Sequence, residues 1–322
     1  MNVENQPRGL HPVASAFRAI LLDSDMAFEN MSIGEARQAA KAFADAFPAP
    51  REEVGKVIDE TIDTGEASLA LRWYHPATPD PEVDGAVILH LHGGGWVMCD
   101  LESHDAICRA LANASGATVL AATYRLAPEY PFPAAHNDAA AVLDWLASQA
   151  DARRIDPNRI AVAGDSAGAN LAASLALAGA VRAGPAIACQ ALFYPVTDLS
   201  GESPSYARCE SGLQLTAPAM RWMRNLYVAG EADRADPRVS LLHAEGMSGM
   251  PPTFILTLEH DPLADEGKTL AERLSQEAGA VTHVHMSGHM HGFLNYGPAW
   301  AEGRAVIAMA AAFLKAWLHK ND

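Results

Sequence analysis

The chain has 322 residues, of which 49% are hydrophobic and 19% charged, a composition typical of a globular protein that can bury a core. Its 39 acidic residues outnumber its 23 lysines and arginines, so the formal net charge is −16. Nucleic acids and anionic membrane surfaces repel such a protein, which argues against both as partners. The four cysteines include no C-x-x-C pair, which favours buried or spectator thiols in a reducing compartment.

The first segment, "MNVENQPRGLHPVASAFRAILLDSD", lacks the cationic start and the apolar run of a signal peptide. No apolar stretch approaches the roughly 20 residues that a helix needs to cross a bilayer. We therefore expect a cytoplasmic protein.

Residues 1–50 are predicted to be helical. The stretch "SIGEARQAAKAFADAF" begins at Ser32, a candidate N-cap, and carries apolar residues at helical spacing. Pro48 and Pro50 follow it and end the helix.

From residue 67 onward, predicted strands and helices alternate, after an antiparallel pair of strands at the front. Alternation of this kind predicts an α/β fold with a mostly parallel, mixed sheet and helices on both of its faces. The predicted strands are 67–76, 86–92, 117–124, 159–164, 187–195, 253–259 and 281–286. The predicted helices of this region are 132–149, 166–182, 264–279 and 299–319.

The segment 200–240 interrupts this alternation. It contains "APAMRWMRNLYVAG", an amphipathic helix that, together with residues 1–50, could cap the C-terminal edge of the sheet, where open α/β sheets bind ligands. The alternative is one more packed helix. In the same way, Met220, Trp222 and Met223 fit either core packing or an apolar wall for an acyl chain.

We expect one domain with an insertion rather than two independent domains. Its predicted parts are a first part of the cap at 1–50, a first part of the core at 51–199, an inserted cap segment at 200–240 and a second part of the core at 241–322.

The sequence Gly164-Asp165-Ser166-Ala167-Gly168 matches G-x-S-x-G and lies between a predicted strand and a predicted helix. That context is the one a nucleophile elbow requires, because the glycines allow a sharp turn that exposes the Ser166 hydroxyl at a helix N-terminus. The alternative, a glycine-rich strand-to-helix turn without chemical meaning, is less favoured in this context than it would be for the pentapeptide alone.

A second glycine-rich loop, His92-Gly93-Gly94-Gly95-Trp96, also follows a predicted strand directly. Without side chains in the way, its backbone N–H groups can point into a cavity and stabilise the oxyanion of acyl transfer. A phosphate-binding loop would need Lys and then Ser or Thr after the glycines, and Trp, Val and Met follow instead.

A serine nucleophile needs a base and an orienting carboxylate, which follow it along the chain in proteins with this elbow. Asp261 lies just past the end of a predicted strand, and His291 lies in a glycine-flanked loop after the next strand. Asp265 and Glu266 suit the first turn of a helix, and Glu259 belongs to the strand.

These blocks, in this order, resemble the bacterial hormone-sensitive lipase family (family IV) of α/β-hydrolase carboxylesterases. The resemblance runs from about residue 86 to residue 293. The matching stretches are "HGGGW" from His92, "YRLAPEYPFPAAHNDA" from Tyr124, "GDSAGAN" from Gly164, "DPLADEG" from Asp261 and "HGF" from His291.

The resemblance implies a serine esterase with an α/β-hydrolase fold and a helical cap. Carried over, it makes Ser166 the nucleophile, His291 the general base and Asp261 the orienting acid. The oxyanion donors it implies are the backbone N–H groups of Gly94, Gly95 and Ala167. It implies no metal and no cofactor, a small-molecule ester of short to medium acyl chain as the substrate, and a homodimer.

The chain departs from the family pattern at Glu259, His260 and His289, which could alter the pKa values of the Asp–His pair. His289 is one of four histidines within nine residues, with His283, His285 and His291. A metal site would need further ligands at zinc-site spacings, which the sequence lacks. We therefore expect His283 and His285 on an edge strand or the surface, His289 in a loop near the active site, and His291 as the functional member.

Two other functions remain open. An amidase, a lactonase or a carbamate hydrolase would use the same catalytic groups and differ in pocket shape. A non-catalytic receptor for a small ligand, like the plant gibberellin receptors of similar fold, is less favoured because such receptors typically lose a triad residue.

Overall fold

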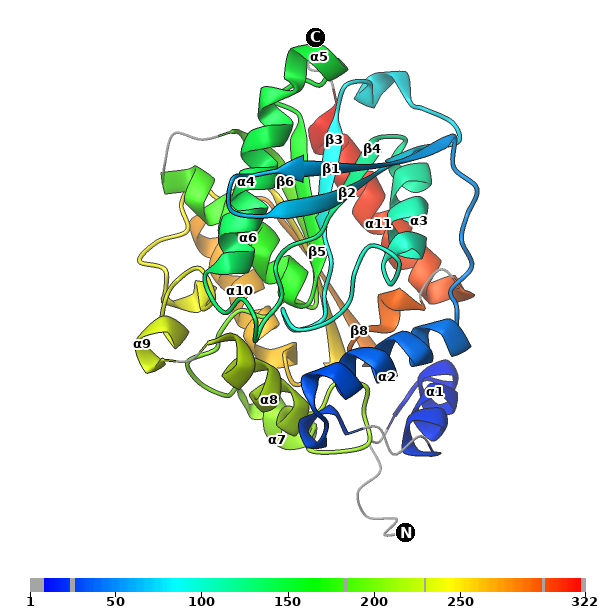
Figure 1. The fold of residues 1–322 in the computed structure, drawn as a ribbon, viewed down its shortest axis with the longest axis vertical. Coiled ribbons are helices and arrows are strands. Elements are labelled where there is room, and N and C mark those ends of the chain that lie inside the picture. Colours follow the sequence, from blue (N-terminus) through cyan, green and yellow to red (C-terminus); the bar gives the residue numbers. More distant parts are fainter. Residues whose placement is uncertain (1–8, 24–26, 182–184, 229, 297–298, 320–322) are drawn as a thin grey trace.

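The computed structural model describes residues 9–23, 27–181, 185–228, 230–296 and 299–319 (Figure 1). Within these residues, eight strands form one sheet in the order β1-β2-β4-β3-β5-β6-β7-β8. The strands are β1 Lys56–Asp63, β2 Ser68–His75, β3 Val87–Leu91, β4 Thr118–Ala122, β5 Ile160–Asp165, β6 Ile187–Phe193, β7 Thr253–His260 and β8 Val281–Met290. Pairing is parallel from β4 through β3 to β8, and antiparallel between β1 and β2 and between β2 and β4. The predicted mixed, mostly parallel sheet is confirmed.

The front of the sheet differs from the prediction. The strand β2 does not pair with β3, its successor along the chain, but lies antiparallel to both β1 and β4. Strand β1, "KVIDETID", was not expected from the sequence. It is an edge strand with one face toward solvent, and only one of its residues, Ile62, is fully buried, so its apolar signal is weak.

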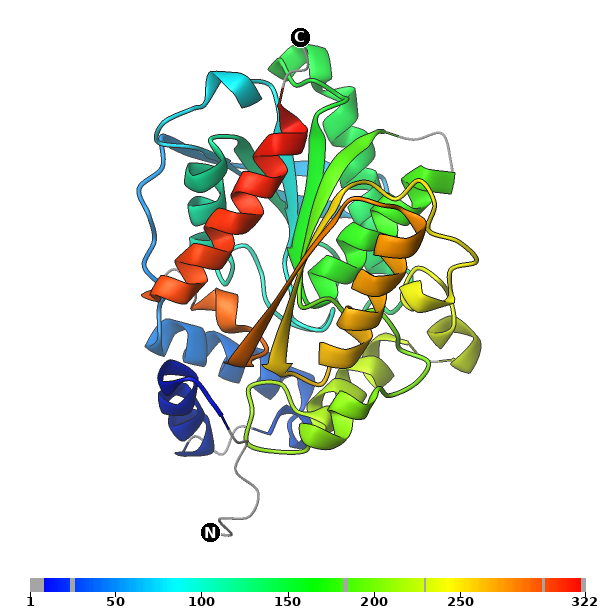
Figure 2. The same ribbon diagram turned by 180° about the vertical axis from the view of Figure 1, so that it is seen from behind.

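Helices cover both faces of the sheet, and each face has its own apolar core (Figures 1 and 2). One core is shared by α4 Ala134–Ser148, α6 Ala167–Val181 and α10 Ala264–Glu277. The other is shared by α3 Asp105–Ser115 and α11 Ala301–Leu318. Strand β3 lies between them with all five of its residues buried, as its continuous apolar run predicts.

The other helices are α1 Pro12–Asp23, α2 Ile33–Ala46, α5 Ala150–Arg153, α7 Pro204–Arg208, α8 Ala217–Tyr227 and α9 Glu231–Arg234. Of these, α1, α2, α7 and α8 lie across the end of the molecule where β7 and β8 finish (Figures 1 and 2). A third apolar cluster joins Phe17 of α1 and Phe43 of α2 to Leu213, so the N-terminal helices and the later insertion pack together.

Local details of the helices agree with the sequence prediction. Ser32 is the N-cap of α2: its hydroxyl accepts the Glu35 N–H, and the Glu35 carboxylate accepts the Ser32 N–H at 2.9 Å. This reciprocal pair satisfies two N–H groups that the helix itself leaves without partners. In the described part of the chain, no helix is both long and apolar enough to traverse a bilayer.

Candidate active site

Ser166 lies at the junction of β5 and α6, where the backbone turns sharply. Its φ angle is +56°, a conformation that non-glycine residues rarely adopt and that costs energy. The two flanking glycines make the turn possible, because a Cβ on Gly168 would collide with the carbonyl oxygen of Leu91 and one on Gly164 would lie 2.5 Å from the Gly168 carbonyl. The Ser166 N–H donates to the Phe193 carbonyl oxygen at 2.9 Å, which ties the turn to β6.

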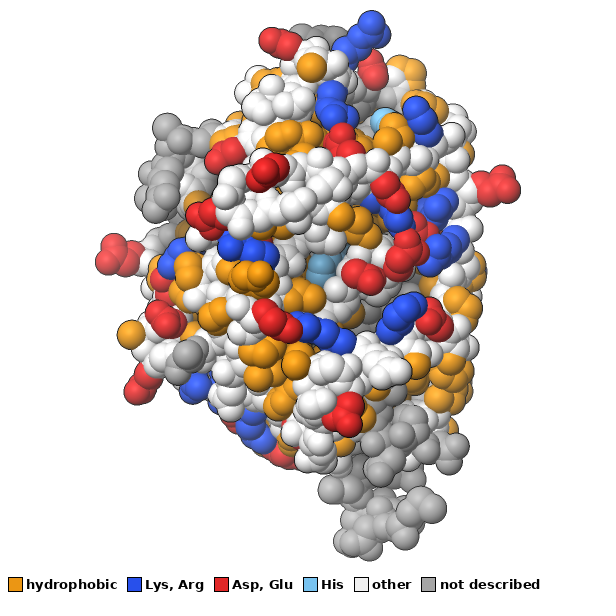
Figure 3. All heavy atoms as spheres, viewed as in Figure 1, with side chains coloured by type: hydrophobic (Ala, Val, Ile, Leu, Met, Phe, Trp, Pro, Cys, Tyr) orange, Lys and Arg blue, Asp and Glu red, His pale blue; other side chains and the backbone are white. Residues whose placement is uncertain are grey.

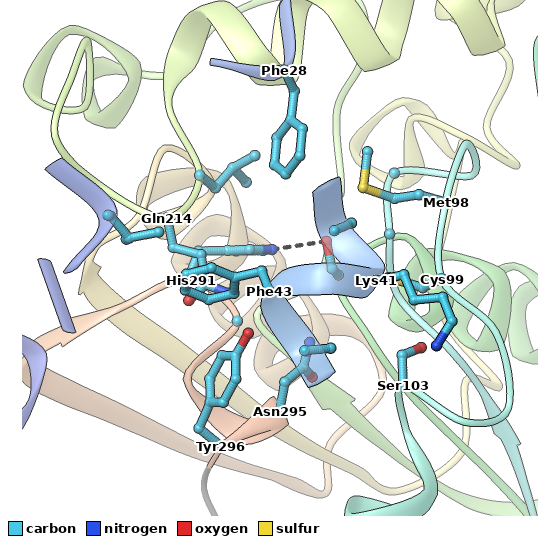
Figure 4. A pocket seen from close by; sticks show the side chains of 18 of the residues that line it. Phe28, Lys41, Phe43, Met98, Cys99, Ser103, Gln214, His291, Asn295 and Tyr296 are labelled. Atoms are coloured by element: carbon cyan, nitrogen blue, oxygen red, sulfur yellow. Dashed lines mark hydrogen bonds between the residues drawn. The ribbon is translucent and has the colours of Figure 1, made fainter. Parts of the chain in front are cut away.

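The structure brings Ser166, His291 and Asp261 into one hydrogen-bonded row. His291 Nε2 lies 2.9 Å from Ser166 Oγ, a hydrogen bond that is dashed in Figure 4. His291 Nδ1 lies 2.8 Å from Asp261 Oδ2. Asp261 is fully buried and follows the end of β7, where its Oδ1 also accepts the Leu263 N–H at 2.8 Å. A buried carboxylate held in this way fixes the orientation of the imidazole.

His291 is positioned by the turn that follows β8. Gly292, next to it, has φ +73°, and the ring of Tyr194 packs edge-on against the imidazole with centroids 4.7 Å apart. Strands β7 and β8 are parallel neighbours, so Asp261 and His291 come from adjacent strand ends.

The glycine loop after β3 runs along the same cavity. Gly94 and Gly95 have φ angles of +110° and +60°, and both line the cavity that contains Ser166. Among the described residues, neither N–H group makes a backbone or side-chain hydrogen bond, so both are free for a ligand oxygen. Ala167 is the first residue of α6, where helical N–H groups also lack an intrahelical acceptor.

Helix α8 packs directly on this loop. A Cβ on Gly95 would collide with the sulfur of Met223, and the ring of Trp96 stacks on Tyr227 with centroids 4.4 Å apart and an interplanar angle of 4°. The inserted segment therefore supports the backbone whose N–H groups face the cavity.

The cavity has a volume of about 810 Å³ and opens above Ser166. Figure 4 shows Phe28, Phe43 and Tyr296 gathered near His291, with Lys41, Cys99 and Ser103 on the opposite side. Apolar lining comes from both N-terminal helices and the insertion, and it includes Leu213, Leu215, Met220 and Met223. On the face seen in Figure 1, acidic, basic and apolar side chains are interspersed (Figure 3).

A family model described as the alpha/beta hydrolase fold matches residues 88–295, the stretch that contains the glycine loop, Ser166, Asp261 and His291. The chain belongs to this α/β-hydrolase family. The hydrolase is 38% identical to an ethyl acetate hydrolase of Pseudomonas putida over 283 residues, which span 87% of this chain and 89% of that protein. It is 36% identical to the carboxylesterase NlhH of Mycobacterium tuberculosis over 256 residues, 77% of this chain and 80% of that protein.

Solved structures agree with these relatives. A thermostable esterase from Pseudomonas putida superposes on the hydrolase with a TM-score of 0.92 at 30% identity, covering 98% of this chain and all of that one. A hyperthermophilic esterase from Pyrobaculum calidifontis superposes with a TM-score of 0.87 at 33% identity, covering 96% and 98% of the two chains. These findings confirm the resemblance to the hormone-sensitive lipase family of esterases, and the hydrolase is a carboxylic ester hydrolase.

The residues that depart from the family pattern stand within two positions of Asp261 or His291 in the chain. The Glu259 carboxylate accepts the Gly288 N–H at 2.7 Å. Burial lowers the pKa of His260, and burial together with the nearby His11 lowers that of His289.

His289 corrects one prediction. It is a buried residue of β8, which continues to Met290, and not a loop residue. Its ring stacks on His11 of the N-terminal segment with centroids 4.8 Å apart, and the pairing of β8 with β7 continues as far as Met290.

The other two histidines of the cluster, His283 and His285, both lie at hydrogen-bonding distance from the Thr257 hydroxyl. His283 Nε2 and His285 Nδ1 lie 2.8 and 2.9 Å from the hydroxyl of Thr257, on the solvent side of β8, as expected for an edge strand. Within the described ranges, no three His, Cys, Asp or Glu side chains gather in a way that could hold a metal ion.

One polar contact beside Ser166 was not predicted from the sequence. His104, which directly precedes α3, lies 3.0 Å from Asp165, the residue before the nucleophile. No spacing rule links two residues so far apart in the chain, and only the adjacency of β3 and β5 brings them together.

Proposed function

We propose that this carboxylesterase hydrolyses short- to medium-chain acyl esters with Ser166 as nucleophile, His291 as general base and Asp261 as its orienting acid. The observation that carries the proposal is the continuous row from Ser166 Oγ through His291 to Asp261, with distances of 2.9 and 2.8 Å, at the wall of the cavity. All three groups belong to the chain, and the reaction needs no metal or cofactor.

In the first half of the reaction, Ser166 Oγ attacks the ester carbonyl while His291 Nε2 takes its proton. Asp261 stabilises the imidazolium that forms. The carbonyl oxygen becomes anionic and accepts hydrogen bonds from the N–H groups of Gly94, Gly95 and Ala167. One donor of this kind is worth about 3 kcal/mol in the transition state.

The first half ends when the alcohol leaves with the proton from His291, and an acyl group stays on Ser166. In the second half, a water molecule, deprotonated by His291, attacks the acyl carbon and releases the acid by the same route. Each step uses the same oxyanion site, so the three N–H groups act twice in each cycle.

The size and lining of the cavity support the acyl-chain range. About 810 Å³ is within the usual range for small-molecule sites, and its apolar part is formed by Phe28, Leu213, Met220 and Met223. Long acyl chains would not fit within this cavity.

We further propose that residues 1–50 and 200–240 form a cap that covers the cavity, and that residues 51–199 and 241–322 form the core.

Hydrolysis of p-nitrophenyl esters of increasing acyl length tests the proposal, with wild type beside Ser166→Ala and His291→Ala. We expect wild type to prefer short esters and both variants to lose activity by several orders of magnitude. A rate on anilides, lactones or carbamates above that on esters would reassign the substrate class. A Ser166→Ala variant with wild-type activity would remove the nucleophile assignment.

A cytoplasmic location and a homodimer remain predictions. Sedimentation at micromolar concentration tests the homodimer, because the mass it measures for a dimer is twice that of the 34.2 kDa chain. A monomer alone would contradict it.

A further inference from the structure

One arginine of the proposed cap is hydrogen-bonded to the backbone that carries the oxyanion loop. Arg37 lies on α2, and its Nε donates to the Val97 carbonyl oxygen at 2.8 Å. Its Nη2 donates to the Ala127 carbonyl oxygen at 2.9 Å, and Nη1 and Nη2 each donate to a different carboxylate oxygen of Glu129 at 2.7 Å. The guanidinium therefore joins α2 to two separate segments of the core, and the reaction steps proposed above do not use it.

Val97 belongs to the turn that contains the proposed oxyanion donors. The Gly94 carbonyl oxygen accepts both the Val97 N–H and the Met98 N–H, each at 3.1 Å, and Gly95 lies within this turn. The turn is tight, because a Cβ on Gly94 would collide with the Met98 carbonyl oxygen. Since the proposed donors are backbone N–H groups, the direction in which they point depends on the conformation of this turn.

The second segment that Arg37 binds supports the same turn. The Ala127 N–H donates to the Trp96 carbonyl oxygen at 2.9 Å, and Val97 and Ala127 are both fully buried. Among the described residues, Arg37 is the only hydrogen-bond donor to the Val97 and Ala127 carbonyl oxygens. A buried carbonyl without a donor is unfavourable, so loss of Arg37 would drive both segments toward other partners and displace the turn.

The ion pair with Glu129 orients the guanidinium. Its hydrogen bonds from Arg37 hold the pKa of the Glu129 carboxyl below the usual value, so this group stays charged near pH 7. A bidentate pair fixes the plane of the guanidinium, which directs Nε at the Val97 carbonyl oxygen. The two side chains are 31% and 49% exposed, so the pair contributes orientation more than stability.

The inserted segment holds the loop in a different way. Met223 of α8 lies where a Cβ on Gly95 would be, and Tyr227 stacks on Trp96. These contacts are apolar packing, which fills space without fixing the direction of a backbone group. Arg37 adds directional hydrogen bonds from α2, so the two parts of the proposed cap act on the loop through different kinds of contact.

We propose that Arg37 is a positioning residue that fastens α2 to the oxyanion loop, so that the loop keeps its donor geometry only while α2 is docked over the cavity. The inference rests on the proposed function of Ser166 and the glycine loop. It gives the N-terminal part of the cap a role in catalysis besides enclosing the substrate. Arg37 acts on the reaction through the backbone of Val97 and Ala127, because its donors are engaged there and at Glu129.

Two substitutions of Arg37 test this role in the steady state. In Arg37→Gln the side chain is too short to span its three partners. We expect kcat for a short p-nitrophenyl ester to fall about tenfold, with KM changed less than about threefold, because misplaced oxyanion donors weaken the transition state more than the bound substrate. Arg37→Lys keeps the charge and a donor and should regain at least threefold of the loss.

Arg273 of α10 offers a matched control. Its Nε donates to Glu277 at 2.6 Å, and its Nη groups donate to the carbonyl oxygens of Leu242 and Ala244 at 2.9 and 2.6 Å, so it makes the same set of bonds without lining the cavity. Arg273→Gln should lower Tm about as much as Arg37→Gln does and leave kcat within twofold of wild type.

Three kinetic results would overturn the inference. The first is a kcat of Arg37→Gln within twofold of wild type. The second is a rise in KM at unchanged kcat, which would make Arg37 a substrate-binding group. The third is an equal loss of kcat in Arg273→Gln, which would show that activity follows stability and not the position of the loop.

The state of the loop can also be measured without activity. The N–H groups of Val97 and Met98 are protected from hydrogen exchange by their bonds to the Gly94 carbonyl oxygen. In the full-length protein, peptides that cover 94–98 should exchange at least tenfold faster in Arg37→Gln than in wild type, and at the wild-type rate in Arg273→Gln. Equal exchange in Arg37→Gln and wild type would contradict the inference.

The same exchange experiment can be run on proteins that also carry Ser166→Ala. It then needs no turnover, so a failure of the proposed esterase mechanism is distinguishable from a failure of the contact between α2 and the loop.

Discussion

The molecule contains two rows of serine, histidine and aspartate. The distances from the histidine nitrogens to the serine and aspartate oxygens are similar in both rows, but the surroundings of the two serines differ. In one, His291 lies between Ser166 and Asp261, at 2.9 and 2.8 Å. In the other, His104 lies between Ser103 and Asp165, at 2.9 and 3.0 Å. Both aspartates are buried.

What separates the two rows is the serine. Ser166 has a strained backbone at φ +56° and stands at the start of α6 facing the free N–H groups of the glycine loop. Ser103 lies in a turn whose geometry holds its hydroxyl against the Asp100 carbonyl. The first hydroxyl can give its proton to histidine and attack, whereas the second already donates to the backbone. Residue types at hydrogen-bonding distance therefore do not by themselves make a nucleophile.

The largest expected effect distinguishes the two serines. Ser166→Ala should lower kcat/KM for a short p-nitrophenyl ester by about 10⁵-fold or more, because it removes the atom that forms the acyl-enzyme. Ser103→Ala removes one neutral hydrogen-bonding group and should cost less than about tenfold. Steady-state kinetics of the two variants measure both effects. Equal losses of kcat/KM would contradict the distinction between Ser166 as nucleophile and Ser103 as a hydrogen-bonding residue.

The next largest effect distinguishes the two aspartates. Asp261→Asn should lower kcat by about 10⁴-fold, because the amide favours the wrong tautomer of His291. Asp165→Asn keeps an oxygen for the Gly93 N–H, so we expect a loss of about tenfold. Stopped-flow acylation rates give both values. A larger loss for Asp165→Asn than for Asp261→Asn would reverse the two roles.

A third effect concerns stability and the buried His90. Burial lowers the pKa of His90 to about 3, and neither ring nitrogen has a hydrogen-bond partner among the described residues. The unfolded chain binds a proton near pH 6.5 and the folded protein does not, so stability present above pH 6.5 is lost as pH falls toward 3. His90 should account for a loss of about 2 kcal/mol at pH 5.

The variant His90→Leu tests this, because it fills similar volume with an apolar side chain. Urea unfolding at pH 7 and pH 5 should show a smaller drop in the free energy of unfolding for His90→Leu than for wild type. An identical drop in both proteins would show that His90 is not the group that titrates.

The smallest effect concerns the histidines of β8 that precede His291. His283→Gln and His285→Gln should each leave kcat/KM within about twofold, because both side chains are largely exposed and bond only to Thr257. The same esterase assay measures this. A loss above tenfold would give these histidines a role that their position does not explain.

Much of the site could be predicted from the sequence, because its backbone conformation is set by residues that are close together in the chain. The strand, turn and helix around Ser166, the glycine run after β3 and the Ser32 cap each depend on residues within a few positions of one another. The row from Ser166 to Asp261 could also be predicted, since each partner follows a strand end and parallel strands end at one edge of the sheet.

Only the tertiary structure decided which side chains meet across the sheet. The exposed edge strand β1 has no strong apolar pattern, and β8 includes His289 because its pairing with β7 continues to Met290. Met220 and Met223 fitted either the core or the cavity, and they contact both. The proximity of His104 to Asp165 follows from β3 and β5 being neighbours in the sheet, which a linear sequence does not express.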